Sequence, residues 1–206
     1  MRKTAIAFLL SAVAFIALAA TPLEPRVRAA VFPEVKRDEL RALGSGVLPV
    51  LVHMYETTPD ETQRTNIAVA FYVLGQKSDA AKRVLMRDVH TANESLRIQV
   101  QWALGRVSDD PQVIDVLADI MQHDTSPLFR DKAACALAED QIHLSDAQKG
   151  RLFAKVIPAL RDPKPQVRTI AITVLQIQTG QTKGYNPNAA LAEREKRVQE
   201  WEQWLA

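Results

Sequence analysis

Apolar residues recur along this chain at spacings of three and four, the pattern of helices that bury one face. Four stretches share one register, in which an arginine is followed by apolar or small residues three and six positions later and by a large apolar residue at the seventh. These arginines are Arg64, Arg97, Arg130 and Arg168, spaced 33, 33 and 38 residues apart. Positions three, six and seven lie on one side of a helix. The shared register therefore predicts four equivalent helices of an internal repeat.

A second amphipathic run precedes each of these stretches. The runs cover residues 47–54, 80–89, 113–121 and 152–160. Turn and helix-start residues separate the two runs of a unit, as in Pro59-Asp60, Asn93-Glu94 and Ser126-Pro127. A unit of helix A, tight turn and helix B cannot bury its apolar face alone and has to stack on its neighbours. The predicted fold is all-α, an α-α superhelix (solenoid) of about four helix pairs over residues 45–180.

The two ends of the array are expected to be capped. Residues 20–44 form an N-terminal segment, of which Ala29 to Leu43 is expected to cover the first repeat. Residues 181–206 are expected to form a loop and a C-terminal capping helix, with Leu191, Val198, Trp201 and Leu205 on one side. We assign Tyr185, Trp201 and Trp204 to this cap. The alternative is a docking element built from Tyr185 and Trp204.

Residues 1–19 have the three parts of a secretory signal peptide. Arg2 and Lys3 give a positive start, the stretch from Thr4 to Ala20 is apolar except at Ser11, and Ala17-Leu18-Ala19 is a small-x-small cleavage pattern. The prediction is export to the periplasm or the outside of the cell. An uncleaved membrane anchor is the alternative, since the apolar stretch approaches the length of a spanning helix.

The charge balance bears on the partners. The chain has 26 Lys and Arg against 24 Asp and Glu, and removal of residues 1–19 takes away two basic residues and no acidic one, which leaves 24 against 24. A neutral chain has no net field to attract nucleic acid, so nucleic acid is not expected as a partner. A membrane is expected as a partner only if the N-terminal segment is retained.

Candidate chemistry is sparse. Cys135 is the single cysteine, which excludes an internal disulfide, and His143 follows eight residues later, expected beyond the end of the helix, where it is not set up to act as a base. His90 and His123 occupy equivalent places in consecutive repeats, too far apart to share one metal ion. We therefore expect no catalytic set, no metal and no cofactor.

The segments Arg97 to Gly105 and Arg130 to Ala138 carry an Arg-x-x-Ala/Val-x-x-Ala-Leu pattern that resembles the HEAT-repeat (armadillo-like) superfamily. The loop Gly184-Tyr185-Asn186-Pro187, followed by a Trp-x-x-Trp helix, is similar to the end of some bacterial HEAT-repeat proteins, and with the leader it resembles an exported member. The resemblance implies that each arginine pairs with an acidic residue near a turn, forming a ladder between repeats. Asp60, Asp124 and Asp162 are the candidates, with Asn93 in the second unit.

The first unit also fits a shifted register, from Ile67 to Gly75, in which Arg64 would not be the repeat arginine. In function, the resemblance implies a non-catalytic scaffold for a protein partner. The alternative is a lyase-like activity, as in the phycobilin-lyase branch of HEAT-like proteins.

Solenoids usually bind along their inner row of helices. Opposite the predicted core side, the first two B helices carry Val69, Tyr72, Ile98 and Trp102, where polar residues would be expected. Adjacent apolar and aromatic side chains that point away from the core indicate an interaction patch, here on the concave surface of the superhelix. Burial of the same residues by the curvature of the superhelix is the alternative.

Overall fold

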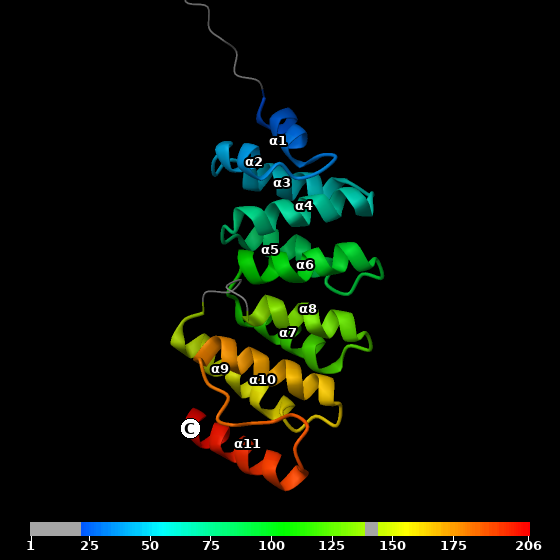
Figure 1. Cartoon of the computed structure of the whole chain (residues 1–206). Helices are drawn as coiled ribbons and strands as arrows, with labels where there is room; N and C mark the ends of the chain where they lie inside the picture. Colours follow the sequence, from blue (N-terminus) through cyan, green and yellow to red (C-terminus); the bar gives the residue numbers. More distant parts are fainter. Residues whose placement is uncertain (1–21, 139–143) are drawn as a thin grey trace, which may run out of the picture.

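The computed structural model describes residues 22–138 and 144–206. The predicted signal peptide and His143 lie outside these ranges. The described residues contain eleven helices and no strand. Figure 1 shows the helices stacked layer upon layer along one axis, with α11 at the end of the stack opposite α1. The all-α solenoid predicted from the sequence is confirmed.

Four helix pairs form the body of the array, and the helices of each kind stack in a row. The A row consists of α3 (Val47–Thr57), α5 (Asp79–Arg87), α7 (Pro111–His123) and α9 (Asp146–Ala159). The B row consists of α4 (Glu61–Leu74), α6 (Glu94–Val107), α8 (Pro127–Ala138) and α10 (Pro165–Thr179). Each B helix packs on the next one along its row.

The turn residues noted in the sequence act as helix caps. The Asp60 side chain accepts hydrogen bonds from the backbone N–H groups of Thr62 and Gln63 at the start of α4, and the Asn93 side chain accepts one at the start of α6. Helix α4 is closed by its C-cap Gly75, whose φ of 60° lies in the left-handed region that glycine adopts at little cost. Local sequence thus sets where the helices begin and end.

The core lies between the two rows and follows the predicted register. Positions three, six and seven after each repeat arginine are all buried, with no more than 1% of any side chain exposed. They are Ile67, Ala70, Phe71, Val100, Ala103, Leu104, Ala133, Ala136, Leu137, Ala171, Val174 and Leu175. Alanine at the sixth position of three units lets the facing helices approach closely, and each large residue stabilises the fold by about 1.5–3 kcal/mol.

The N-terminal segment extends both rows. Helix α1 (Leu23–Val31) packs on α3, and α2 (Arg37–Ala42) packs on α4. Val27, Val31 and Leu40 are buried in this contact. The segment thus has the layout of an additional short helix pair that covers the first repeat.

At the other end, α11 (Leu191–Leu205) packs on α9 and closes the array. Val198 and Trp201 are buried, whereas Leu191, which was expected on the same side, is 70% exposed. Leu191 is the first residue of α11, and the buried residues of the helix begin only with Val198. The expectation for Leu191 was therefore wrong.

The four repeat arginines bind the turns of their own repeats. Each guanidinium donates a hydrogen bond to a backbone carbonyl just before its own B helix: Arg64 to Thr58 and Pro59, Arg97 to Val89, Arg130 to Asp124 and Thr125, and Arg168 to Asp162 and Pro163. Arg64 makes the same kind of contact as the other three. The repeat register therefore begins at Arg64, and the shifted register was wrong.

Each arginine also reaches the next layer of the stack. Arg64 pairs with Asp88, 3.1 Å from Nε to the carboxylate, and Arg97 pairs with Asp124. Arg130 donates to the side-chain oxygen of Gln166. Arg168 donates to the backbone carbonyl of Pro187 in the loop before the cap, at 2.8 Å.

This ladder corrects the pairing expected from the resemblance. The Asp60 and Asn93 side chains cap helices, and the Asp162 side chain accepts the backbone N–H of Lys164. Of the expected candidates, Asp124 does form such a rung, with the arginine of the preceding repeat. Asp60 and Asn93 are engaged by the first backbone N–H groups of their own B helices, because these N–H groups have no partner inside the helix.

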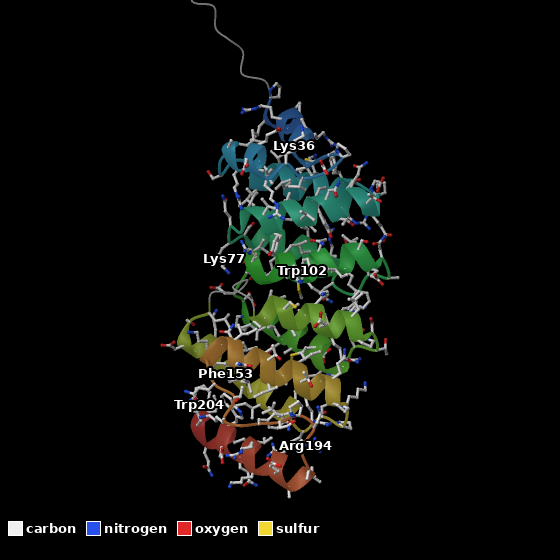
Figure 2. The ribbon with its side chains drawn as sticks, viewed as in Figure 1. Lys36, Lys77, Trp102, Phe153, Arg194 and Trp204 are labelled. Carbon is white, nitrogen blue, oxygen red and sulfur yellow. The ribbon has the colours of Figure 1, made fainter. Side chains whose placement is uncertain are left out.

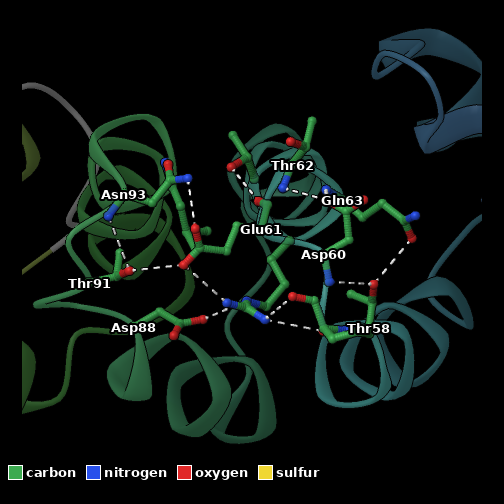
Figure 3. A network of polar contacts seen from close by, with 12 residues as sticks. Thr58, Asp60, Glu61, Thr62, Gln63, Asp88, Thr91 and Asn93 are labelled. Carbon is green, nitrogen blue, oxygen red and sulfur yellow. Dashed lines mark hydrogen bonds and ion pairs between the residues drawn. The ribbon is translucent and has the colours of Figure 1, made fainter.

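Figure 3 shows the first of these junctions. The Tyr55 hydroxyl donates to Asp88 at 2.7 Å, so Asp88 joins α3 to Arg64 of α4. Glu61 accepts from the Asn93 amide at 2.9 Å. Burial and the neighbouring Asp88 carboxylate raise the pKa of Tyr55, which keeps its proton in this bond.

Candidate functional site

The predicted patch of Val69, Tyr72, Ile98 and Trp102 lies on the outer side of α4 and α6, and Figure 2 labels Trp102 in this row. All four side chains are half-buried, and Val69, Tyr72 and Trp102 rest partly against the core. The rings of Tyr72 and Trp102 are 6.2 Å apart between centroids. The structure therefore brings the two aromatic residues together and covers part of each.

Two cationic side chains flank the aromatic pair. The Arg106 guanidinium carbon lies 4.7 Å from the centroid of Tyr72, and the Lys132 ammonium lies 5.8 Å from the centroid of Trp102. Such stacking holds the rings in place by cation–π attraction. The result is an amphipathic strip across α4, α6 and α8, with an aromatic centre and charged ends.

A groove of about 200 Å³ continues the same face between α8 and α10. Ala134, Cys135 and Ala138 form its α8 wall, and Ile177, which is 47% exposed, lies on its α10 wall. Cys135 is half-buried and lines this groove. The small α8 residues leave the space open.

The aromatic residues assigned to the cap have different environments. Trp201 of α11 is fully buried, and Tyr185 is buried with its hydroxyl donating to the carbonyl of Leu160. Burial also raises the pKa of the Tyr185 phenol. Trp204 remains 42% exposed. The docking alternative is therefore wrong for Tyr185, which fastens the loop to the array.

Trp204 lines a second groove, of about 410 Å³, which was not foreseen from the sequence. We name it the cap groove and define it by Lys149, Gly150, Phe153, Gln181, Trp204 and Leu205. Figure 2 labels Phe153 and Trp204 near one another between α9 and α11. The two residues are 51 positions apart, so helix periodicity could not bring them together. The docking alternative named Trp204 but not its neighbours on α9.

Two of the residues considered for metal binding lie on the surface. His90 and His123 are exposed, and His123 contacts Asp119 at 2.9 Å through Nδ1. Within residues 22–138 and 144–206, no group of three or more His, Cys, Asp or Glu side chains is placed to hold a metal ion. In the same ranges no helix is long and apolar enough to cross a membrane.

Ion pairs connect the A row across successive units. Lys82 of α5 lies 2.7 Å from Asp110 at the start of α7, and Arg151 of α9 pairs with Asp115 of α7. These hydrogen bonds lower the pKa of Asp110 and of Asp115 and raise those of Lys82 and Arg151. The pairs join neighbouring helices, so these pKa shifts are explained by structural contacts.

Comparison with known proteins agrees with the repeat geometry. Residues 48–138 match a family model described as HEAT repeats, and the match spans the first three helix pairs, from α3 to the end of α8. Searches of curated proteins and of solved structures found no match. The stacked helix pairs agree with this match, which makes residues 48–138 similar to HEAT repeats.

Proposed function

We propose that this chain is a non-catalytic scaffold that binds a protein partner. The binding surface is the side of the B row that faces away from the core, which is expected to be the concave side of the superhelix. HEAT repeats commonly serve as protein-interaction scaffolds. The observation that carries the proposal is the half-exposed Tyr72–Trp102 pair flanked by Arg106 and Lys132. Aromatic residues beside cations are typical of interface hot spots.

The partner-binding test uses the double variant Tyr72→Ala/Trp102→Ala. Partner proteins captured by the wild type should be recovered at least about tenfold less by this variant, because hot-spot truncations cost about 2 kcal/mol or more. Leu191→Ala is the matched control, since it removes an exposed apolar side chain from the opposite end of the array. Unchanged recovery by a double variant with a native circular dichroism spectrum would contradict the proposal.

We also propose that the chain is exported and that residues 1–19 are removed. The support is the sequence of the leader, with its positive start, apolar stretch and small-x-small site. Mass spectrometry of the protein purified from the periplasm of a bacterial host should give a mass lower by that of the leader. A full-length mass in the membrane fraction would show an anchor instead.

The non-catalytic part of the proposal has its own test. A turnover activity of the purified chain that disappears in Cys135→Ser would overturn it, because Cys135 is the single thiol.

A further inference from the structure

We propose that the cap groove docks a segment of a protein partner in which an apolar side chain stands next to a carboxylate. The groove lies between α9 and the end of α11, away from the Tyr72–Trp102 patch on the B row. The inference therefore goes beyond the proposed function, and either one can fail without the other.

The first observation is an aromatic wall that the fold does not need to expose. Trp201 is fully buried and already anchors α11. The Trp204 ring packs at an angle against those of Phe153 and Trp201, with 5.3 Å between the ring centroids of each pair, yet 42% of the residue is exposed. A half-exposed tryptophan on a rigid base is the kind of anchor that protein interfaces use.

The second observation is the space at Gly150. This residue lies inside α9, where glycine destabilises a helix relative to alanine. A Cβ built at Gly150 meets nothing within 4 Å, so packing within the chain does not require a glycine. The missing side chain leaves the floor of the groove open beside Phe153.

The third observation is the charge around the groove. Lys149 lines it, and Lys183 lies beside it, with its ammonium 5.4 Å from the centroid of Trp204 and donating to the Gln181 side chain at 3.3 Å. Among residues 22–138 and 144–206, the one carboxylate of the lining is Asp146, which lies 3.9 Å from Lys149 and is fully solvated. Two cations against one anion favour an occupant with a negative charge next to its apolar part.

The size and charge of the groove favour a protein segment over a lipid surface. Electrostatic binding to anionic membranes takes a cluster of about four to eight basic residues. The cap groove offers two, around a pocket of about 410 Å³, within the size range of sites that bind small ligands. One apolar side chain with its neighbouring carboxylate matches this arrangement.

The experiment uses the whole protein, in which 5-fluorotryptophan replaces the three tryptophans. Two dipeptides serve as probes. Acetyl-Leu-Glu-amide should shift the ¹⁹F resonance of Trp204 saturably and leave that of Trp102 unchanged. Acetyl-Leu-Gln-amide, which has the same shape without the charge, should bind about two- to fivefold more weakly at low salt. Equal affinity of the two probes, or no shift of Trp204, would overturn the proposal.

Variants locate the effect in the groove. Gly150→Leu should fill the floor and abolish the shift, while Gly150→Ala controls for the gain in helix propensity. Lys149→Gln should remove the preference for the glutamate probe, whereas Lys155→Gln, on the same helix beside Asp115, should leave it unchanged. Retained binding by Gly150→Leu would contradict the assignment, as would anionic lipid vesicles perturbing Trp204 when the dipeptides do not.

Discussion

The upper and lower halves of the B row use the same arginine position with different acceptors. Between the first three layers, Arg64 and Arg97 reach aspartates of the next repeat, Asp88 and Asp124. Further along, Arg130 reaches the Gln166 side chain and Arg168 a backbone carbonyl of the cap loop. All four also bind the turn of their own repeat. The constant requirement is thus a planar donor that binds two layers at once, and a negative partner is not essential.

The difference predicts unequal energies. Both side chains of the Arg97–Asp124 pair are about nine-tenths buried, so removal of one leaves the other charged and desolvated. At Gln166 the removal of the arginine leaves a neutral amide. The upper junctions are therefore expected to be the more costly ones to break.

The largest effect is expected for Arg97→Ala. The variant leaves Asp124 unpaired and removes the guanidinium that lies 4.0 Å over the Phe129 ring. We expect a loss of about 3–5 kcal/mol in the free energy of unfolding, measured by urea denaturation at pH 7. Arg83→Ala, at an exposed site on α5, should change it by less than about 0.5 kcal/mol. A similar loss of unfolding free energy in both variants would show that the buried Arg97–Asp124 pair does not stabilise the fold.

Next in size is Tyr55→Phe, which removes the hydroxyl that Asp88 accepts from. Hydrogen bonds to charged groups contribute about 1.5–3 kcal/mol, and Asp88 keeps Arg64 as a partner, so we expect a loss toward the lower end of that range. Thermal unfolding monitored by circular dichroism measures it. Wild-type stability would show that the contact with Arg64 alone holds this junction.

A smaller effect is expected in the lower half. Gln166→Ala removes the side-chain acceptor of Arg130, which keeps the carbonyls of Asp124 and Thr125. We expect a loss of about 0.5–1.5 kcal/mol by urea denaturation. A loss as large as that of Arg97→Ala would show that the two halves are held equally.

The smallest effect is a dependence on pH at the cap. Hydrogen bonds from Arg161 lower the pKa of Glu195 and of Glu202 in the folded state. Carboxyls with a lowered folded pKa contribute stability that is complete above their unfolded pKa of about 4.3 and is lost as pH falls through the folded value. The contact between α11 and α9 should therefore weaken below about pH 4, seen in the fluorescence of Trp201. Arg161→Gln should flatten this dependence, and an unchanged profile would contradict the assignment.

The stacking of the molecule could be predicted from the sequence because it depends on short-range periodicity. The register of the four arginines fixed the buried positions, and the turn residues fixed the helix starts. The ladder partners could not be predicted in the same way. Asp88 lies nine residues before its repeat arginine and Asp124 six before its own, because the turns differ in length. Pairing across layers therefore does not follow the repeat period.

Long-range contacts also explain what the sequence left open at the candidate sites. The Tyr72–Trp102 patch followed from two helix faces in one register, but its half-burial depends on how closely α4 and α6 pack. The cap groove depends on α11 meeting α9 across an intervening helix and loop. Leu191 was placed on the packing side by periodicity alone, although α11 makes buried contacts only further along its length.

The central claim is that one arginine position ties each layer to the next, more strongly where its partner is a buried carboxylate. Two double-mutant cycles test it directly, one with Arg97→Ala and Asp124→Ala and one with Arg130→Ala and Gln166→Ala. We expect a coupling energy of about 2–3 kcal/mol for the first pair and about 0.5–1 kcal/mol for the second. A coupling near zero for Arg97 and Asp124, with a larger one for Arg130 and Gln166, would contradict the account.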